Sequence, residues 1–172
     1  FNWLFAKQNK GEFLLRIEDT DIERSKKEFE DEIREGLRWL NLNWDGEVYR
    51  QSERREIYRK YLEKLIAEKR AYYCYCSKED LEAERQSMVA DGLPPKYRGH
   101  CRTLTNAPRE NTPGVIRFIV PEVKVDFKDL IRGKVEFDAG LFGDIVIAID
   151  LDRPLYNFAV VIDDWEMKIS HI

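Results

Sequence analysis

The sequence predicts an α/β fold in which a parallel sheet with covering helices is interrupted by an α+β insertion. Three observations support this prediction. An almost wholly apolar run, Phe13–Ile17, is followed by acidic residues and by two amphipathic helical patterns, as in half of a doubly wound unit. From Val115 the apolar period changes to two, which is typical of antiparallel strands. A second apolar run, Ile145–Ile149, then marks the return of a buried strand.

The bulk composition is that of a globular protein from a reducing compartment. The chain has 172 residues, of which 43% are hydrophobic and 36% charged, enough for one core or for one domain plus an insertion. Its apolar runs are too short to cross a bilayer and it opens without a signal peptide, so no membrane association is expected. Three cysteines, two of them one residue apart, argue against a disulfide framework. We therefore expect a cytoplasmic location.

The net charge of −4 is unevenly distributed along the chain. Residues 94–134 carry nine Lys/Arg against four Asp/Glu, whereas residues 135–172 carry two against eight. A basic middle suits an anionic partner that touches only this part of the surface. Ordinary surface patchiness explains the same counts, so charge alone leaves both interpretations open.

The first part of the chain alternates helix and strand signals. Asn2–Gln8 is typical of the last turns of a helix that ends at Gly11, and its apolar face leads us to expect that the protein starts further upstream. Phe13–Ile17 predicts a strand buried on both faces. Ser25–Glu28 is a capping box that opens the next helix. The side chains that this helix is expected to bury are Phe29, Ile33, Leu37 and Leu40.

The middle and last parts change in character. Residues 41–49 are turn-rich, so no parallel strand is expected at once, and Ser52 starts a second helix. Ser77 caps a short helix that ends near Gly92. The period-two segments predict antiparallel strands, at 115–120, 123–127 and 134–137. After the apolar run at 145–149, a helix is expected over 156–162, and residues 168–172 resemble the opening of another parallel strand.

Two charged side chains flank Ile17 near the end of the first predicted strand. Arg16 and Glu18 are two residues apart and point the same way, which is costly beside a core unless they are paired or used. Acidic residues at the carboxyl end of such a strand face the crevice where open α/β sheets bind ligands. A solvated acidic turn that caps the next helix is the alternative interpretation.

The segment Arg16-Ile-Glu-Asp-Thr-Asp21, followed by Arg24, resembles the signature of glutamyl-tRNA synthetases, which are class I enzymes. The resemblance covers essentially the whole chain. It continues through Gly36-Leu-Arg-Trp39, Tyr49-Arg-Gln-Ser-Glu-Arg54, Ala71-Tyr-Tyr-Cys-Tyr-Cys76 and Tyr156-Asn-Phe-Ala-Val-Val-Ile-Asp-Asp164. Glutaminyl-tRNA synthetases and the tRNA-modifying glutamyl-queuosine synthetases carry a similar stretch, usually with a different residue near Thr20 or Asp21.

The resemblance implies a class I synthetase Rossmann-like parallel sheet with an inserted connective-peptide domain. Residues 1–71 would form the first part of the catalytic domain. Residues 72–137 would form the α+β insertion that holds the acceptor end of tRNA. Residues 138–172 would return to the catalytic domain.

The implied reaction is the ATP-dependent activation of glutamate, with Mg²⁺, and its transfer to the 3′ end of tRNA(Glu). The implied partners are glutamate, ATP and tRNA(Glu), and the full-length protein is expected to be a monomer. Neither a His-Ile-Gly-His-like motif nor a Lys-Met-Ser-Lys-Ser-like loop occurs in the sequence. We therefore assign no catalytic residue within this chain and expect the chain alone to be inactive. The alternatives are a non-catalytic tRNA- or zinc-binding module and a relative of the glutamyl-queuosine synthetases.

The resemblance also assigns substrate-binding residues. Glu18 would hold the α-amino group of glutamate, with Tyr156 and Arg16 in the same pocket. A fixed carboxylate and an aromatic wall suit an ammonium group, although Tyr156 also fits a core aromatic. Asp21 and Arg24 lie where a nucleotide or the tRNA 3′ end can meet them, but helix capping explains Asp21 equally well.

Cys74, Cys76 and Cys101 form a candidate zinc site. Zinc prefers four thiolate or imidazole donors, and the chain offers three cysteines with a suitable spacing. Family members that bind zinc often end in Cys-x-His, where this chain has Thr103. The substitutes are Tyr97, similar to a variant with tyrosine as fourth ligand, and His100, which is strained by its position next to Cys101. Three reduced cysteines that pack as small hydrophobes are the alternative.

Overall fold

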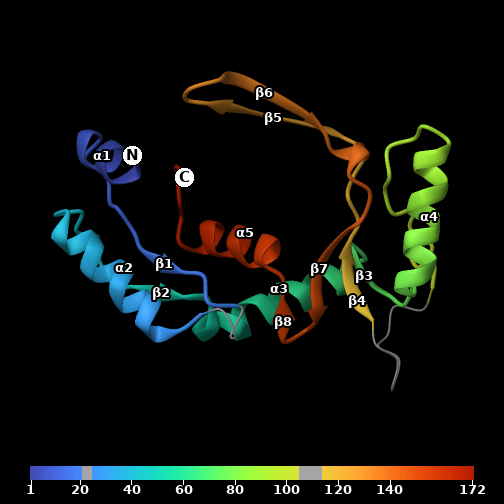
Figure 1. Ribbon diagram of the computed structural model, residues 1–172, viewed down its shortest axis with the longest axis horizontal. Helices are drawn as coiled ribbons and strands as arrows, with labels where there is room; N and C mark the ends of the chain where they lie inside the picture. The colour runs from blue at the N-terminus through green and yellow to red at the C-terminus, as the bar shows by residue number, and fades with distance from the viewer. Residues whose placement is uncertain (21–24, 105–113) are drawn as a thin grey trace. The chain divides into compact units, whose positions relative to one another are not determined.

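The computed structural model describes residues 1–20, 25–104 and 114–172, which form two compact units (Figure 1). The first unit comprises Phe1–Arg59 and Asp152–Ile172, and the second comprises Lys60–Leu151. The domain boundaries drawn from the sequence, after residues 71 and 137, remain a prediction. Among the described residues, no helix combines the length and the apolar character needed to cross a bilayer.

The first unit contains a parallel strand pair and most of the helices (Figure 1). Its elements in chain order are α1 (Asn2–Gln8), β1 (Arg16–Ile17), α2 (Lys27–Trp39), β2 (Tyr49–Arg50), the 3₁₀ turn η1 (Gln51–Arg54), the start of α3 (Arg55–Ala67), β8 (Arg153–Pro154) and α5 (Tyr156–Glu166). β1 pairs in parallel with β2, Arg16 opposite Tyr49. The α/β character predicted from the sequence is confirmed.

The strand that pairs in parallel with β1 comes earlier in the chain than the sequence predicted. Residues 41–49 were expected to hold only turns, but the ladder starts where Asp45 N donates to Phe13 O at 2.8 Å and Tyr49 N to Leu15 O at 3.1 Å. The Phe13–Ile17 run is half-buried, not buried on both faces. A strand as short as β2 has too few residues to show an apolar period, so the pattern could not reveal it.

Two expectations about α2 are wrong. The helix begins after Lys26, whose carbonyl accepts from Phe29 N at 3.0 Å, and no side chain caps it, so Ser25 does not form the predicted box. The face that was expected to be buried is largely open, with Phe29 50%, Ile33 55% and Leu40 56% exposed. Phe29 and Ile33 border a cavity, and about half of each side chain stays open.

The five described α-helices end in the same Schellman motif, with a left-handed residue just past the helix. These residues are Lys10, Asn41, Lys69, Gly92 and Lys168. The left-handed residue that follows α1 is therefore Lys10, one residue before the predicted Gly11. After α5, Ile169 N bonds back to Asp164 O at 2.8 Å. This turn explains why residues 168–172 form no strand, contrary to the sequence prediction.

The second unit is an antiparallel sheet with a helix and a hairpin (Figure 1). Its elements after α3 are β3 (Ala71–Cys74), α4 (Lys78–Ala90), β4 (Val115–Phe118), β5 (Lys124–Asp129), β6 (Gly133–Asp138), η2 (Ala139–Leu141) and β7 (Ile145–Asp150). The predicted antiparallel strands are confirmed, and β4 lies between β3 and β7. The predicted cap of α4 is also confirmed, because Ser77 Oγ accepts from Asp80 N at 3.0 Å.

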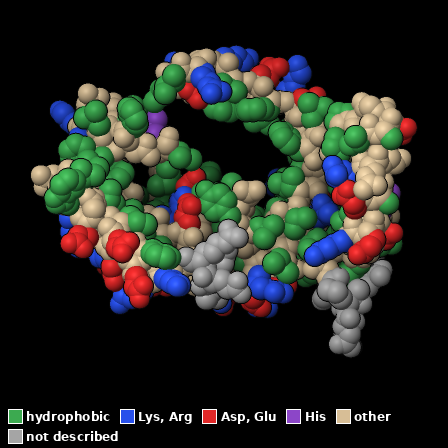
Figure 2. Space-filling view, viewed as in Figure 1, with side chains coloured by type: hydrophobic (Ala, Val, Ile, Leu, Met, Phe, Trp, Pro, Cys, Tyr) green, Lys and Arg blue, Asp and Glu red, His purple; other side chains and the backbone are tan. Residues whose placement is uncertain are grey.

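The β5–β6 hairpin has two unlike faces. Figure 2 shows hydrophobic side chains along one side of the hairpin and charged side chains along the other. Val125 pairs with Phe137 and Phe127 with Val135, whereas Lys124 bonds Glu136 at 3.0 Å. Since side chains alternate along a strand, the apolar residues share one face and the charged ones the opposite face.

Candidate functional site

The carboxyl end of β1 carries the charged residues that the sequence singled out. Arg16 lies in the strand and Glu18 directly follows it, so both stand where parallel strands present ligand-binding groups. Arg16 Nη2 donates to Glu18 Oε1 at 3.3 Å, which is the pairing expected from their spacing. The Glu18 side chain is 35% exposed and the Arg16 side chain 14%.

Helix α5 supplies two further acids to this cluster. Arg16 Nη1 donates to Asp164 Oδ1 at 2.7 Å, and Arg16 Nε lies 3.8 Å from Asp163 Oδ2. Burial opposes the positive charge of Arg16, but Asp164, Glu18 and Asp163 outweigh it and raise the pKa of the guanidinium. Both acids belong to a motif that carries the family resemblance, but no role was predicted for them. Their signal was an adjacent acid pair in an apolar helix, which predicts buried partners.

Asp163 is fully buried and is held by three neighbouring side chains. Tyr58 Oη donates to its carboxylate at 2.9 Å, Gln51 Nε2 at 3.0 Å and Arg54 Nε at 2.7 Å. Burial and the neighbouring Asp163 raise the pKa of Tyr58. A buried carboxylate with this many donors fixes η1 and α3 against α5.

The remaining predicted residues of this site are not all brought together. Tyr156 is the first residue of α5 and is 50% exposed, and among the described residues no hydrogen bond or ring contact joins it to Glu18. Asp19 accepts from the backbone and hydroxyl of Ser52, at 2.8 and 2.6 Å, which ties the end of β1 to η1. Asp21 and Arg24 lie outside the described residues.

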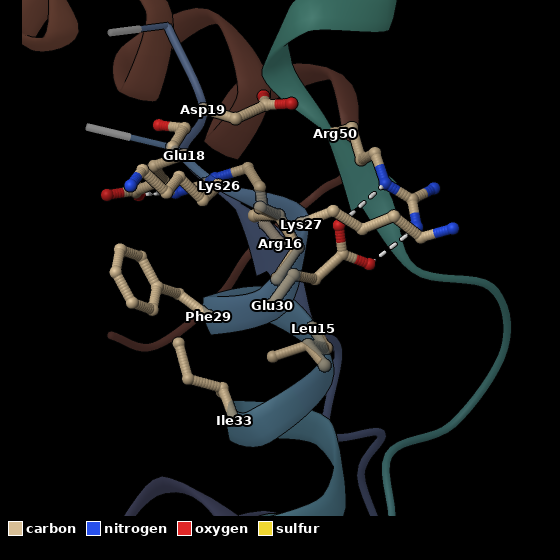
Figure 3. A pocket seen from close by; sticks show the side chains of 12 residues that line it. Leu15, Arg16, Glu18, Asp19, Lys26, Lys27, Phe29, Glu30, Ile33 and Arg50 are labelled. Carbon is tan, nitrogen blue, oxygen red and sulfur yellow. Dashed lines mark hydrogen bonds and ion pairs between the residues drawn. The ribbon is translucent and has the colours of Figure 1, made fainter. Parts of the chain in front are cut away.

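A cavity of about 660 Å³ opens beside this strand end (Figure 3). Figure 3 shows Leu15, Phe29 and Ile33 on its apolar side and the paired Arg50 and Glu30 on its polar side. Arg50 binds Glu30 through two nitrogens, at 2.6 and 3.1 Å, and this hydrogen bonding lowers the pKa of Glu30. Glu18 also borders the cavity, so a ligand held by Glu18 has space in front of it.

The second unit brings together the three cysteines, as the sequence predicted. Their sulfur atoms all lie within 4.8 Å of one another, and Cys76 Sγ is 3.6 Å from Cys101 Sγ. The Tyr97 hydroxyl lies 3.4 Å from Cys74 Sγ and 3.3 Å from Cys76 Sγ, and it accepts from Cys101 N at 3.1 Å. His100 instead contacts Glu84 Oε1 at 2.9 Å and stays exposed, so Tyr97 is the fourth group of the cluster.

Three distances within this cluster are close to those of a zinc tetrahedron. Zinc–sulfur bonds of about 2.3 Å place two thiolates of a tetrahedron about 3.8 Å apart, close to the distance from Cys76 to Cys101. A zinc–oxygen bond of about 2.0 Å places the oxygen about 3.5 Å from each thiolate, close to the distances from Tyr97. The donor set therefore fits a structural zinc ion.

The surroundings shift the pKa values of Cys74 and Cys76 in opposite directions. Burial opposes ionisation of Cys74, but hydrogen bonds with Tyr97, the Cys76 backbone and Arg117 outweigh it and lower the Cys74 pKa to about 7. Burial raises the pKa of Cys76 to about 11. The Arg117 guanidinium also lies 3.9 Å from the centre of the Tyr97 ring. A positive charge this close to the ring favours anionic ligands in the cluster.

A buried carboxylate, Asp144, connects the segments that carry the cysteines. Arg102, next to Cys101, binds it through two nitrogens at 2.5 and 2.6 Å. Tyr72, two residues before Cys74 in β3, donates to it at 2.6 Å. Burial opposes ionisation of Asp144, but the bonds from Arg102, Tyr72 and Val120 N outweigh it and lower its pKa. This network fixes the relative positions of Cys74 and Cys101.

Comparison with known proteins covers the whole chain. The family described as tRNA synthetases class I (E and Q), catalytic domain, matches residues 1–172. A glutamate–tRNA ligase from a Sulfurihydrogenibium species is 49% identical over 185 residues, and one from Caldicellulosiruptor saccharolyticus is 50% identical over 186 residues. Both alignments cover 100% of this chain but only 39% and 38% of the relatives, so the chain spans well under half of their length.

A solved structure agrees with the sequence comparison. The crystal structure of a glutamate tRNA ligase from Elizabethkingia meningosepticum, in complex with its amino acid, matches with a TM-score of 0.81 and 36% identity. The match covers 99% of this chain and 38% of that protein. The predicted class I synthetase fold is thereby confirmed. The chain belongs to the family of class I tRNA synthetases for glutamate and glutamine and lies within the catalytic domain that defines this family.

Proposed function

We propose that this chain is part of a glutamate–tRNA ligase, which activates glutamate with ATP and transfers it to the 3′ end of tRNA(Glu). The observation that carries the proposal is the whole-chain similarity, at 48–50% identity, to proteins that bear this name. Because those relatives are much longer, the activity is proposed for a protein of their length that contains this chain. We refer to that protein as the full-length enzyme.

In this proposal the carboxylate of Glu18 binds the α-ammonium group of glutamate. The cluster around it contains the carboxylates of Glu18, Asp163 and Asp164 and the guanidiniums of Arg16 and Arg54. Three negative and two positive charges leave one negative charge in excess, and Glu18 is the most exposed of the three acids. An ammonium group at Glu18 would neutralise that excess. Tyr156 would provide the aromatic wall of the same pocket.

The other predicted ligands are assigned to the rest of the chain. Residues 72–137 would hold the acceptor end of tRNA, and Asp21 and Arg24 would meet the nucleotide or the tRNA 3′ end. Cys74, Cys76, Cys101 and Tyr97 would hold zinc, which supplies a structural cross-link between β3 and the loop that carries Cys101. ATP and Mg²⁺ would be bound mainly by residues outside this chain. A monomeric, cytoplasmic enzyme remains the prediction, in keeping with three free cysteines.

The test is glutamate-dependent pyrophosphate exchange by the full-length enzyme in the presence of tRNA(Glu). We expect exchange with glutamate, no exchange with glutamine, and attachment of glutamate to the tRNA 3′ end. Removal of the 3′-terminal adenosine should abolish the attachment. Attachment that survives this removal would instead support a tRNA-modifying relative. Binding of tRNA without any exchange would support a non-catalytic module.

A further inference from the structure

We propose that Asp164 positions the carboxylate of Glu18 through Arg16, and that Arg16 itself does not touch the substrate glutamate. The inference rests on the proposed function and deepens it, since it separates the group that contacts the substrate from the groups that orient it. It also reassigns Arg16, which the resemblance placed in the glutamate pocket.

The three nitrogens of the Arg16 guanidinium all face acids of the protein. Nη1 binds Asp164 at 2.7 Å, Nη2 binds Glu18 at 3.3 Å, and Nε lies 3.8 Å from Asp163. Arg16 Nε is buried without a hydrogen-bond partner in the described structure, so solvent and ligands do not reach it. A guanidinium arranged in this way has no open edge for a bidentate bond to a carboxylate of the substrate.

The anchor at the far end of this chain of contacts is firmly held. Asp164 lies in the last turn of α5, where its carbonyl accepts from Ile169 N. Its neighbour Asp163 is fixed by Tyr58, Gln51 and Arg54. The Asp164 side chain is 22% exposed and the Glu18 side chain 35%, so exposure increases from α5 towards the substrate side. Arg16 thus connects an acid of α5 to a more open carboxylate.

Loss of the Asp164 charge should strengthen the pairing of Arg16 with Glu18. With asparagine at position 164, the guanidinium loses its strongest competing anion and pairs more fully with Glu18. That pairing neutralises the charge that would receive the ammonium group. In the full-length enzyme, Asp164→Asn should therefore raise the KM for glutamate about tenfold while kcat and the KM for ATP change less than about twofold.

Three comparisons separate positioning from general damage. Asp164→Asn combined with Glu18→Gln should be no worse than Glu18→Gln alone, because both changes act through one interaction. Glutarate, which lacks the amino group, should inhibit wild type and Asp164→Asn equally well. Glu53→Gln, which removes an exposed acid 3.5 Å from another arginine of the same unit, should leave the KM for glutamate unchanged.

Arg16→Lys provides a second variant in case Asp164→Asn does not fold. Lysine keeps the charge but lacks the planar fork by which Arg16 binds Asp164 and Glu18 through different nitrogens, so the KM for glutamate should rise while the inhibition constant of glutarate stays constant. A parallel rise of both values would show that Arg16 contacts a substrate carboxylate and would overturn the inference. An unchanged KM for glutamate in either folded variant would also overturn it. A wild-type enzyme without glutamate-dependent exchange would overturn the proposed function itself and this inference with it.

Discussion

The hydroxyl of Tyr97 lies 3.3 Å from the sulfur of Cys76. It occupies the fourth corner of a cluster whose other corners are sulfur atoms, and Arg117 lies against its ring. This arrangement gives the second unit a cross-link between segments that are more than twenty residues apart.

The full-length enzyme, purified without chelator, should contain one zinc ion, and Tyr97→Phe should weaken its retention. Loss of the oxygen leaves three sulfur ligands and should lower zinc affinity by about tenfold or more in a chelator competition. Tyr73→Phe, at a tyrosine of β3 outside the cluster, is the matched control. Unchanged affinity in Tyr97→Phe would exclude the tyrosine as a ligand. Less than about a tenth of an equivalent of zinc in folded wild type would exclude the site.

Glu18→Gln should weaken the use of glutamate by the full-length enzyme. The change keeps the shape of the side chain but removes the charge that is proposed to bind the ammonium group, which costs about 1–3 kcal/mol in kcat/KM. Steady-state pyrophosphate exchange over a range of glutamate concentrations measures this loss. Kinetics equal to wild type would show that Glu18 is not the ammonium ligand.

Asp144→Asn should destabilise the second unit. The substitution leaves Arg102 with a buried partner that carries no charge and weakens the bonds to Tyr72 and Val120 N. Because the Arg102 side chain is 42% exposed, solvent screens part of this pair, and the loss of the charge should cost about 1–3 kcal/mol, measured as the shift of the urea midpoint multiplied by the m value. Asp126→Asn, at an exposed residue of the hairpin, should cost much less. Equal midpoints for Asp144→Asn and wild type would contradict a stabilising role of the network.

The contribution of Asp144 should also depend on pH. Its pKa is lower in the folded state than the ordinary value of 3.8, so the unfolded chain takes up the proton first as the pH falls. The stabilisation is therefore complete above the unfolded pKa and decreases as the pH falls towards the folded pKa. Urea unfolding at a series of pH values should show the difference between wild type and Asp144→Asn shrinking below about pH 4. A difference that stays constant down to pH 2 would rule out this linkage.

The 172-residue chain by itself should not activate glutamate. Its sequence contains neither of the two ATP-binding signatures of class I synthetases, and it has no glycine-rich phosphate loop. Without such groups, nothing fixed stabilises the charge that develops at phosphorus, a contribution of several kcal/mol in many enzymes. Pyrophosphate exchange with glutamate and tRNA is the measurement. Turnover within about tenfold of a full-length ligase would show that the chemistry lies within this chain.

Local patterns in the sequence predicted most of the helices and strands that are long enough to show an apolar period. The helix after Pro154, the cap at Ser77 and the alternating strands at 115–118 and 124–138 are present. The period failed where an element was too short or lacked a partner. β2 has only two residues, so spacing could not reveal that this strand exists. The apolar side of α2 borders a cavity, so spacing could not reveal how much of that side is buried.

The sequence by itself determined the family, the strand end that carries Arg16 and Glu18, and the set of cysteines, because motif identity and spacing are local properties. Only the tertiary structure decided which acids pair with Arg16, since Asp164 lies 148 residues away in α5. It also decided that Tyr97, not His100, joins the cysteines, and that Asp144 connects Tyr72 with Arg102. A sequence period shows which side of its own element a residue occupies. The partner of a buried charge depends on how distant segments pack, and packing is set by the fold as a whole.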